Sequence, residues 1–173
     1  MIFKKTTYLA CVVFLSLAAG TVHAGPKVET LQVIGPWEVR SAATQGDKLL
    51  FCYIRSPGGA NGLRVALDPS DGWFVSYPAF APKGQDLQAT FSFDGSDAMD
   101  MTINLSSNGK MARGLVDDAF LERYRSTETV TMRLRDETTK LATDGVDPAL
   151  SAVETCLAAF SGAATDQTRE SGQ

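Results

Sequence analysis

The chain has 173 residues, a formal net charge of −4 and 44% hydrophobic residues, with one histidine and three cysteines. This length predicts one ordinary domain that buries most of its apolar surface. The mild acidic excess gives no global attraction to nucleic acid or to anionic lipid, so neither is expected as a partner.

The first 24 residues have the layout of a secretory leader. Lys4-Lys5 precedes an apolar stretch over residues 8–19, and Val22-His23-Ala24 places small residues at the two positions that a signal peptidase reads. The apolar stretch is shorter than the roughly 20 residues of a spanning helix. We therefore expect a signal peptide over residues 1–24, cleavage before Gly25, a periplasmic or secreted product, and no membrane span after leader removal.

Loss of this leader changes the chemistry of the chain. It removes the only histidine, His23, and Cys11, so that the remaining thiols are Cys52 and Cys156. In an oxidising compartment the economical expectation is one disulfide between these two cysteines. The leader also carries two lysines and no acid, so the mature chain has a formal charge of −6.

Most of the mature chain is predicted to form short strands separated by turns. The first group of expected strands covers residues 31–34, 37–40, 48–55, 64–67 and 73–77. Between the last two of these strands, Asp68-Pro-Ser-Asp-Gly72 predicts a hairpin, because Pro and Gly suit a tight connection.

The second group of strands is indicated by alternation. Apolar and polar side chains alternate over residues 87–93, 99–105 and 128–135, which is typical of half-buried strands in an antiparallel sheet. Asn108-Gly109 predicts a hairpin turn that leads into a brief return strand over residues 110–115.

Two helices are expected. Asp117-Asp118 places acids at the start of a short helix, where the helix dipole favours them. The longer helix has Asp147 as N-cap and Pro148 in its first position, and it ends at Gly162. Its apolar stripe consists of Leu150, Val153, Leu157 and Phe160. Residues 163–173 are polar and are predicted to be a disordered tail.

These elements predict a mainly β domain over residues 25–162. We expect an antiparallel β-sandwich or a barrel-like domain with a C-terminal α-helix. The Cys52–Cys156 bridge would attach this helix to a central strand.

The absence of histidine from the mature chain argues against most catalysis. Histidine-dependent hydrolases and histidine-ligated zinc are excluded, and neither a nucleophile elbow nor a phosphate loop is present. We therefore expect a protein that is not an enzyme and has no cofactor. The catalytic alternative is a hydrolase of envelope polysaccharide that uses the clustered carboxylates Asp117, Asp118 and Glu122. Their other interpretation is a helix N-terminus that attracts acids.

Two charged groups are candidate ligand sites. Asp94, Asp97 and Asp100 form either a weak calcium site or an acidic turn, and the turn is favoured because Asp, Gly and Ser all suit turns, so no metal is assigned. The local excess of basic residues comprises Arg123, Arg125, Arg133 and Arg135, with Lys140 nearby. This set is the candidate binding site for an acidic partner or a glycan. The alternative is a solvated sheet face that pairs with Glu128, Asp136 and Glu137.

Four segments resemble a known family. They are Gly35-Pro36-Trp37-Glu38-Val39, Phe51-Cys52, Asn61-Gly62-Leu63-Arg64-Val65 and the closing segment from Leu141 to Cys156. In these segments the chain resembles the invasion-associated locus B family of alphaproteobacterial exported proteins. The resemblance implies a small β-sandwich-like periplasmic or surface protein without known catalysis.

The resulting expectation is a non-enzymatic exported binding protein of this type. It would engage a protein or a cell-envelope component through sheet edges, the basic strand and the loop over residues 56–62. A periplasmic inhibitor or immunity protein, and the carboxylate-dependent hydrolase, are the alternatives.

Overall fold

The computed structural model describes residues 25–55, 62–78, 86–96, 98–105 and 110–170. The predicted leader and most of the loop over residues 56–62 lie outside this part of the chain. The described strands are β1 Lys27–Ile34, β2 Trp37–Ala43, β3 Leu49–Arg55, β4 Arg64–Asp68, β5 Gly72–Pro78, β6 Asp86–Phe93, β7 Ala98–Leu105, β8 Met111–Leu115, β9 Thr129–Leu134 and β10 Glu137–Ala142. The two helices are α1 Asp118–Ser126 and α2 Val146–Glu170.

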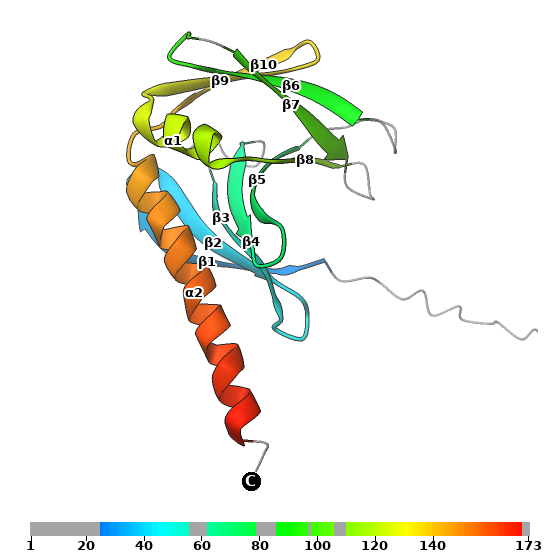
Figure 1. Ribbon diagram of the computed structural model, residues 1–173, viewed down its shortest axis with the longest axis vertical. Helices are drawn as coiled ribbons and strands as arrows, with labels where there is room; N and C mark the ends of the chain where they lie inside the picture. The colour runs from blue at the N-terminus through cyan, green and yellow to red at the C-terminus, as the bar shows by residue number, and fades with distance from the viewer. Residues whose placement is uncertain (1–24, 56–61, 79–85, 97, 106–109, 171–173) are drawn as a thin grey trace, which may run out of the picture.

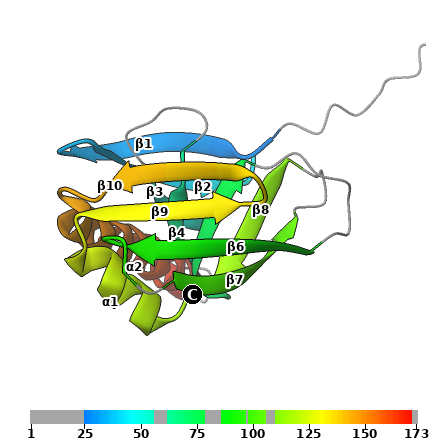
Figure 2. The same cartoon turned by 90° about the horizontal axis from the view of Figure 1, so that it is seen from above.

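The strands form one antiparallel sheet with the order β1-β2-β3-β4-β5-β8-β7-β6-β9-β10. The sheet is open and folds over on itself, so that β10, β9, β6 and β7 form one layer and β1 to β5 form the other (Figure 1). Seen from above, the first layer lies over β2, β3 and β4, and β1 extends beyond β10 (Figure 2). The predicted fold class, a mainly antiparallel β-sandwich-like domain with a C-terminal helix, is confirmed.

The core lies between the two layers and is closed at one side by the helices. Alternation along β6 turns Leu87, Ala89, Phe91 and Phe93 inward. The α1 side chain Phe120 is fully buried and meets the rings of Phe91 and Phe93 edge-on. Edge-to-face contacts of this kind suit the quadrupoles of aromatic rings. The core therefore ties α1 to the layer that contains β6.

The long helix α2 packs against β2, β3 and β4. Its Cys156 forms the predicted disulfide with Cys52 of β3, with the two Cα atoms 6.2 Å apart. At the start of the helix, the buried Trp37 indole donates a hydrogen bond to the Asp144 carbonyl (2.6 Å). The disulfide on α2 and the hydrogen bond just before its first residue thus attach this segment to the sheet.

The bounds of α2 differ from the prediction at both ends. The helix begins at Val146, one residue before the expected N-cap, after a turn in which Val146 N–H donates to the Thr143 carbonyl. It continues to Glu170, so the helix end expected at Gly162 is wrong, and the helix covers most of the segment predicted to be a disordered tail. A glycine inside a helix costs only about 1 kcal/mol relative to alanine, and Ala163 and Ala164 directly follow it.

Strand β10 was not expected from the sequence. Its residues are mostly polar, and Leu141 is its one buried apolar side chain. It is formed by a tight turn at Arg135, whose φ is +54°, and by pairing with β9 from Leu134–Glu137 to Thr129–Ala142. Backbone pairing and the hydroxyl contact between Thr139 and Tyr77 therefore hold a strand that hydrophobic alternation does not indicate.

Candidate functional site

The structure separates the four arginines that the sequence indicated as a binding site. Arg123 and Arg125 lie on α1, next to the start of β9. Arg133 is exposed on β9, and Arg135 lies beyond its other end. Arg135 lies six positions after Thr129, which corresponds to about 20 Å along an extended strand. The two pairs therefore occupy opposite ends of β9, and a shared binding role for them stays a prediction.

Arg125 is engaged by carboxylates of α2. Its guanidinium lies 2.9 Å from the Glu154 carboxylate and 3.5 Å from that of Asp147. Arg123 instead lines a shallow pocket of about 300 Å³ together with Asp94 and Thr127. Arg125 thus connects the two helices, whereas Arg123 faces a surface depression.

The acidic turn is confirmed in its described part. Asp94 has a φ of +50° and Gly95 a φ of +73°, and Ser96 N–H donates to the Phe93 carbonyl, so the chain reverses tightly. The Asp94 carboxylate accepts hydrogen bonds from the N–H groups of Glu128 and Thr129. Hydrogen bonds from the Thr127 hydroxyl first, and then from Thr129, hold the pKa of Asp94 below its usual value.

The other aspartates of this segment do not join Asp94. Asp100 accepts a hydrogen bond from the Thr90 hydroxyl (2.8 Å), and Asp97 lies outside the described residues. In the part of the chain that is described, no three metal-ligating side chains come together. The Asp94 carboxylate is thus already hydrogen-bonded to backbone N–H groups at the start of β9.

The carboxylates proposed for catalysis have different surroundings. Asp117 is the N-cap of α1 and accepts a hydrogen bond from Phe120 N–H (2.8 Å). Asp118 and Glu122 line a second groove, of about 380 Å³, together with Trp73 and Glu154. The carboxylates of Asp118 and Glu122 therefore share a surface that excludes Asp117, and the hydrolase remains an untested alternative.

A groove of about 520 Å³ lies where β7 separates from β8. In the described residues these strands pair only at Asn104–Arg113 and Leu105–Ala112. The chain that leaves β8 stays with β5 instead, because Val116 N–H donates to the Trp73 carbonyl (3.1 Å). The residues around the groove are Met99, Asp100, Met101, Thr102 and Asn104 of β7, and Leu115, Val116, Asp117 and Phe120 of β8 and α1.

The wall formed by β7 is a strand edge. Successive residues line the groove although their side chains point to opposite faces of the sheet, so the backbone itself faces the opening. Pairing with β6 runs the length of this segment, from Ala98 to Asn104. In an antiparallel strand, alternate residues direct their N–H and C=O groups away from that neighbour. The groove therefore presents backbone donors and acceptors over Met99–Ile103 that β8 does not pair.

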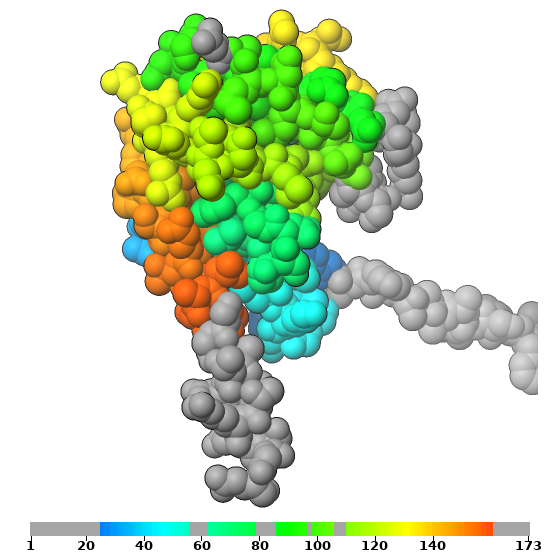
Figure 3. Space-filling model, in the orientation of Figure 1, coloured from blue at the N-terminus to red at the C-terminus, as the bar shows by residue number. Residues whose placement is uncertain are grey.

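The walls combine these polar groups with apolar surface. Leu115 is 61% exposed, and Met99 and Met101 are partly buried against the core. Methionine is unbranched and polarisable, so it adapts to differently shaped ligands. In the space-filling view the green surface of β6 and β7 adjoins yellow-green α1 on one face (Figure 3). The arrangement is suited to an extended chain that pairs with β7 and rests its side chains on these residues.

Sequence reasoning did not identify this groove. The alternation over residues 99–105 correctly indicated a half-buried strand, and Asn108-Gly109 indicated a hairpin between β7 and β8. The turn itself lies outside the described residues. Neither signal says how far the two strands remain paired, because the separation depends on the bend between the two layers.

No family model matches the sequence, and no curated protein matches it. Among solved structures, the crystal structure of invasion associated protein B from Bartonella henselae is similar, with a TM-score of 0.42 and 8% sequence identity. The alignment covers 73% of this chain and 96% of that chain. This is a distant likeness in fold, so membership of the invasion-associated locus B family stays a prediction.

Two observations bear on the location of the protein. The Cys52–Cys156 disulfide is compatible with an exported protein. Neither described helix has both the length and the apolar composition that crossing a bilayer requires.

Proposed function

We propose that this chain is a non-enzymatic exported binding protein that holds an extended segment of a protein partner in the groove between β7, β8 and α1. The observation that carries the proposal is the edge of β7 over Met99–Ile103, which no other described strand pairs on the side away from β6, inside a concave surface. Main-chain hydrogen bonds to such an edge supply affinity, and pockets for alternate side chains supply specificity.

The groove also favours a particular kind of partner segment. Its apolar contacts include Leu115, Met99 and Met101, and its carboxylates are Asp100 and Asp117. Asp100 and Asp117 already accept hydrogen bonds from Thr90 and Phe120 N–H. A segment that alternates apolar and neutral or basic residues matches this surface, because an acidic segment would be repelled by both carboxylates.

The test is a selection of extended peptides on the immobilised, processed protein, followed by titration of the selected peptides. We expect the double variant Leu115→Lys with Thr102→Lys to weaken binding at least tenfold, about 1.4 kcal/mol. Both side chains are exposed, so these substitutions leave the core unchanged. Thr138→Lys, on the edge strand β10, is the matched control and should leave binding of the same peptides unchanged.

A second measurement separates strand addition from simple apolar contact. In an antiparallel pairing only every second N–H group of the peptide faces β7. Methylation of these nitrogens should abolish binding, whereas methylation of the other set should leave binding unchanged. Equal binding by both methylated forms would contradict pairing with β7. Failure to select any peptide that depends on Leu115 would contradict the site.

A further inference from the structure

The edge strand β1 is exposed along almost its whole length. Seven of its eight residues are exposed, and these include Val28 at 45%, Leu31 at 44% and Val33 at 64%. Among the described strands, its one neighbour is β2. The opposite edge strand, β10, exposes mainly polar side chains, such as Glu137, Thr138 and Lys140. Charged residues on an edge discourage pairing with another chain, whereas an exposed apolar edge invites it.

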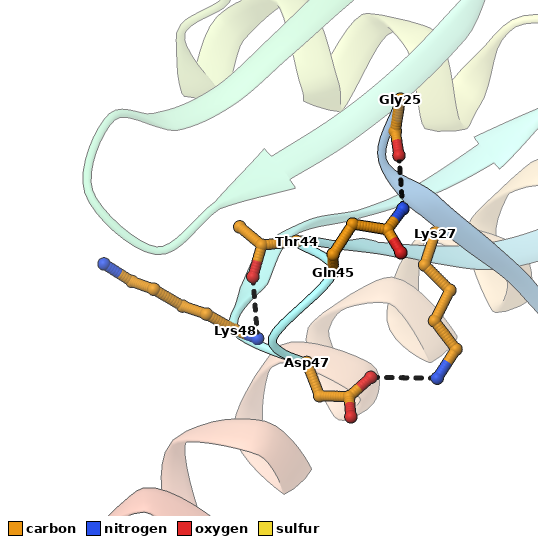
Figure 4. Close-up of polar contacts among 6 residues, drawn as sticks. All are labelled: Gly25, Lys27, Thr44, Gln45, Asp47 and Lys48. Atoms are coloured by element: carbon orange, nitrogen blue, oxygen red, sulfur yellow. Dashed lines mark hydrogen bonds and ion pairs between the residues drawn. The ribbon is translucent and has the colours of Figure 1, made fainter. Parts of the chain in front are cut away.

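The start of β1 contacts the turn between β2 and β3 (Figure 4). Lys27 Nζ lies 2.8 Å from the Asp47 carboxylate, in the turn between β2 and β3. In the same turn the Gln45 side-chain amide donates to the Gly25 carbonyl (2.7 Å). The free edge is therefore presented in a defined conformation from its first residue, and the charge of Lys27 is balanced within the chain.

A bulge gives β1 an unusual distribution of side chains. The pairing with β2 shifts register between Thr30 and Gln32. Before the bulge Val28 pairs with Ala42, and after it Val33 pairs with Glu38. Ala42 and Glu38 are four residues apart, so they share one face of the sheet. Without the bulge, two valines five residues apart would lie on opposite faces. The bulge places both on the outer face, away from the core residue Trp37.

This distribution makes β1 complementary to itself. An antiparallel pairing with a second copy, about a two-fold axis between Thr30 and Leu31, sets Val28 opposite Val33 of that copy. The same register sets Glu29 opposite Gln32 and Lys27 opposite Ile34. Every one of these pairs joins side chains of the same face, as the pairing with β2 shows. No like charges lie opposite one another, and such pairs would be destabilising.

The new pairs would also extend an existing apolar row. Across the outer face, Val28 pairs with Ala42, and Ala42 pairs with Phe51 of β3. Phe51 packs against Tyr53 and Phe74, with ring centroids 5.6 and 5.5 Å apart. The row ends at the exposed edge of β1. Val33 of a second copy, seated beside Val28, would continue it and remove both valines from water.

From these observations we infer that the protein forms a two-fold dimer through antiparallel pairing of β1 with β1 of a second copy. Such an interface is isologous, and it joins the two sheets into one. This surface is distinct from the groove at β7, so the dimer goes beyond the proposed function and can fail without affecting it.

The test is the molar mass of the processed protein in solution, measured by light scattering and sedimentation over a range of concentrations up to about 100 μM. We expect a dimer for the parent. Val28→Lys with Val33→Lys places lysines opposite each other at both ends of the pairing, and we expect the dissociation constant to rise at least tenfold. Val28→Lys with Val33→Glu sets Lys opposite Glu instead, and we expect this variant to dimerise again.

Folding is checked separately by the melting temperature and by the intact disulfide in each variant. Both substituted positions are exposed, so the monomer should fold in all of them. Thr138→Lys on the edge strand β10 should leave the dimer intact. A monomeric parent at about 100 μM would overturn the inference, and so would equal association by the Lys–Lys and Lys–Glu variants.

Discussion

At the scale of single residues, one aspartate shows how a turn residue acquires a structural role. Asp94 occupies a left-handed turn position, which aspartate and asparagine tolerate better than most residues. There its carboxylate meets the N–H groups of Glu128 and Thr129, 34 and 35 residues further along the chain. The contact attaches the turn after β6 to the start of β9. The hydrogen bond from the Thr127 hydroxyl, and after it these N–H groups, lower the pKa of Asp94.

This contact predicts a pH-dependent contribution to stability. A carboxyl whose pKa is lower in the folded state stabilises the fold above its unfolded pKa, and the contribution is lost as the pH falls through the folded pKa. We expect Asp94→Asn to melt at a lower temperature than the parent at pH 7, because the charge is lost while the turn is kept. The difference should narrow as the pH falls below about 4.

Thermal unfolding of both proteins from pH 7 to pH 2 measures this effect. Asp86→Asn is the matched control, since Asp86 is exposed at the other end of the strand that leads into this turn, and its melting temperature should differ little from that of the parent at every pH. If the difference in melting temperature between Asp94→Asn and the parent stayed constant down to pH 2, the Asp94 charge would not be the source of the stabilisation.

At the scale of elements, α2 is joined to the sheet by a disulfide and by apolar packing. The bridge closes a sequence separation of 104 residues and joins the helix to β3. In the chain-entropy model, a loop of this length gives about 4 to 5 kcal/mol of stability. Leu150 and Val153 are fully buried on the same helix, so apolar packing adds to the covalent link.

We expect replacement of both cysteines by serine to lower the free energy of unfolding by about 4 to 5 kcal/mol, as measured by urea denaturation. Reduction of the parent should have a similar effect, and it should raise the intact mass by about two hydrogens. The serine variant provides the control, because reductant should not change its stability. An unfolding midpoint shared by parent and variant would show that packing alone holds α2.

At the scale of the whole molecule, the decisive feature is the corner at which the sheet passes from one layer to the other. Gly114 of β8 lies at this corner, close to β7. A Cβ atom at Gly114 would lie 2.6 Å from Met101 Sδ and 3.3 Å from the Thr102 carbonyl oxygen. The close approach lies next to the point at which β7 leaves β8, which in the described residues follows two pairs, Asn104–Arg113 and Leu105–Ala112.

Gly114→Ala should therefore destabilise the protein by about 1 to 3 kcal/mol, because the methyl group overpacks this contact. Urea denaturation measures the change. Gly46→Ala is the matched control: its nearest atom would be 3.9 Å away, and the expected change is within about 0.5 kcal/mol. Met101→Ala in the Gly114→Ala background should recover part of the loss. A neutral Gly114→Ala would mean that the corner has more room than the structure indicates.

Local patterns in the sequence determined the elements and the covalent link. Alternation indicated the strand that carries Phe91, the acids at Asp117 and Asp118 indicated α1, and the count of cysteines indicated the bridge. Each of these signals is local or compositional, because side-chain period and capping act within a few residues. Strand β10 was not predicted, because backbone hydrogen bonds to β9 hold it in place and its sequence shows no alternation of apolar and polar residues.

The candidate surfaces were decided by tertiary structure alone. The opening between β7 and β8 depends on where the folded sheet bends, and the outward placement of Val28 and Val33 depends on a bulge relative to β2. The separation of Arg123 and Arg125 from Arg135 likewise depends on the direction of β9. Sequence proximity did not gather these arginines, because an extended strand moves the chain about 3.3 Å per residue and so carries neighbours in sequence far apart in space.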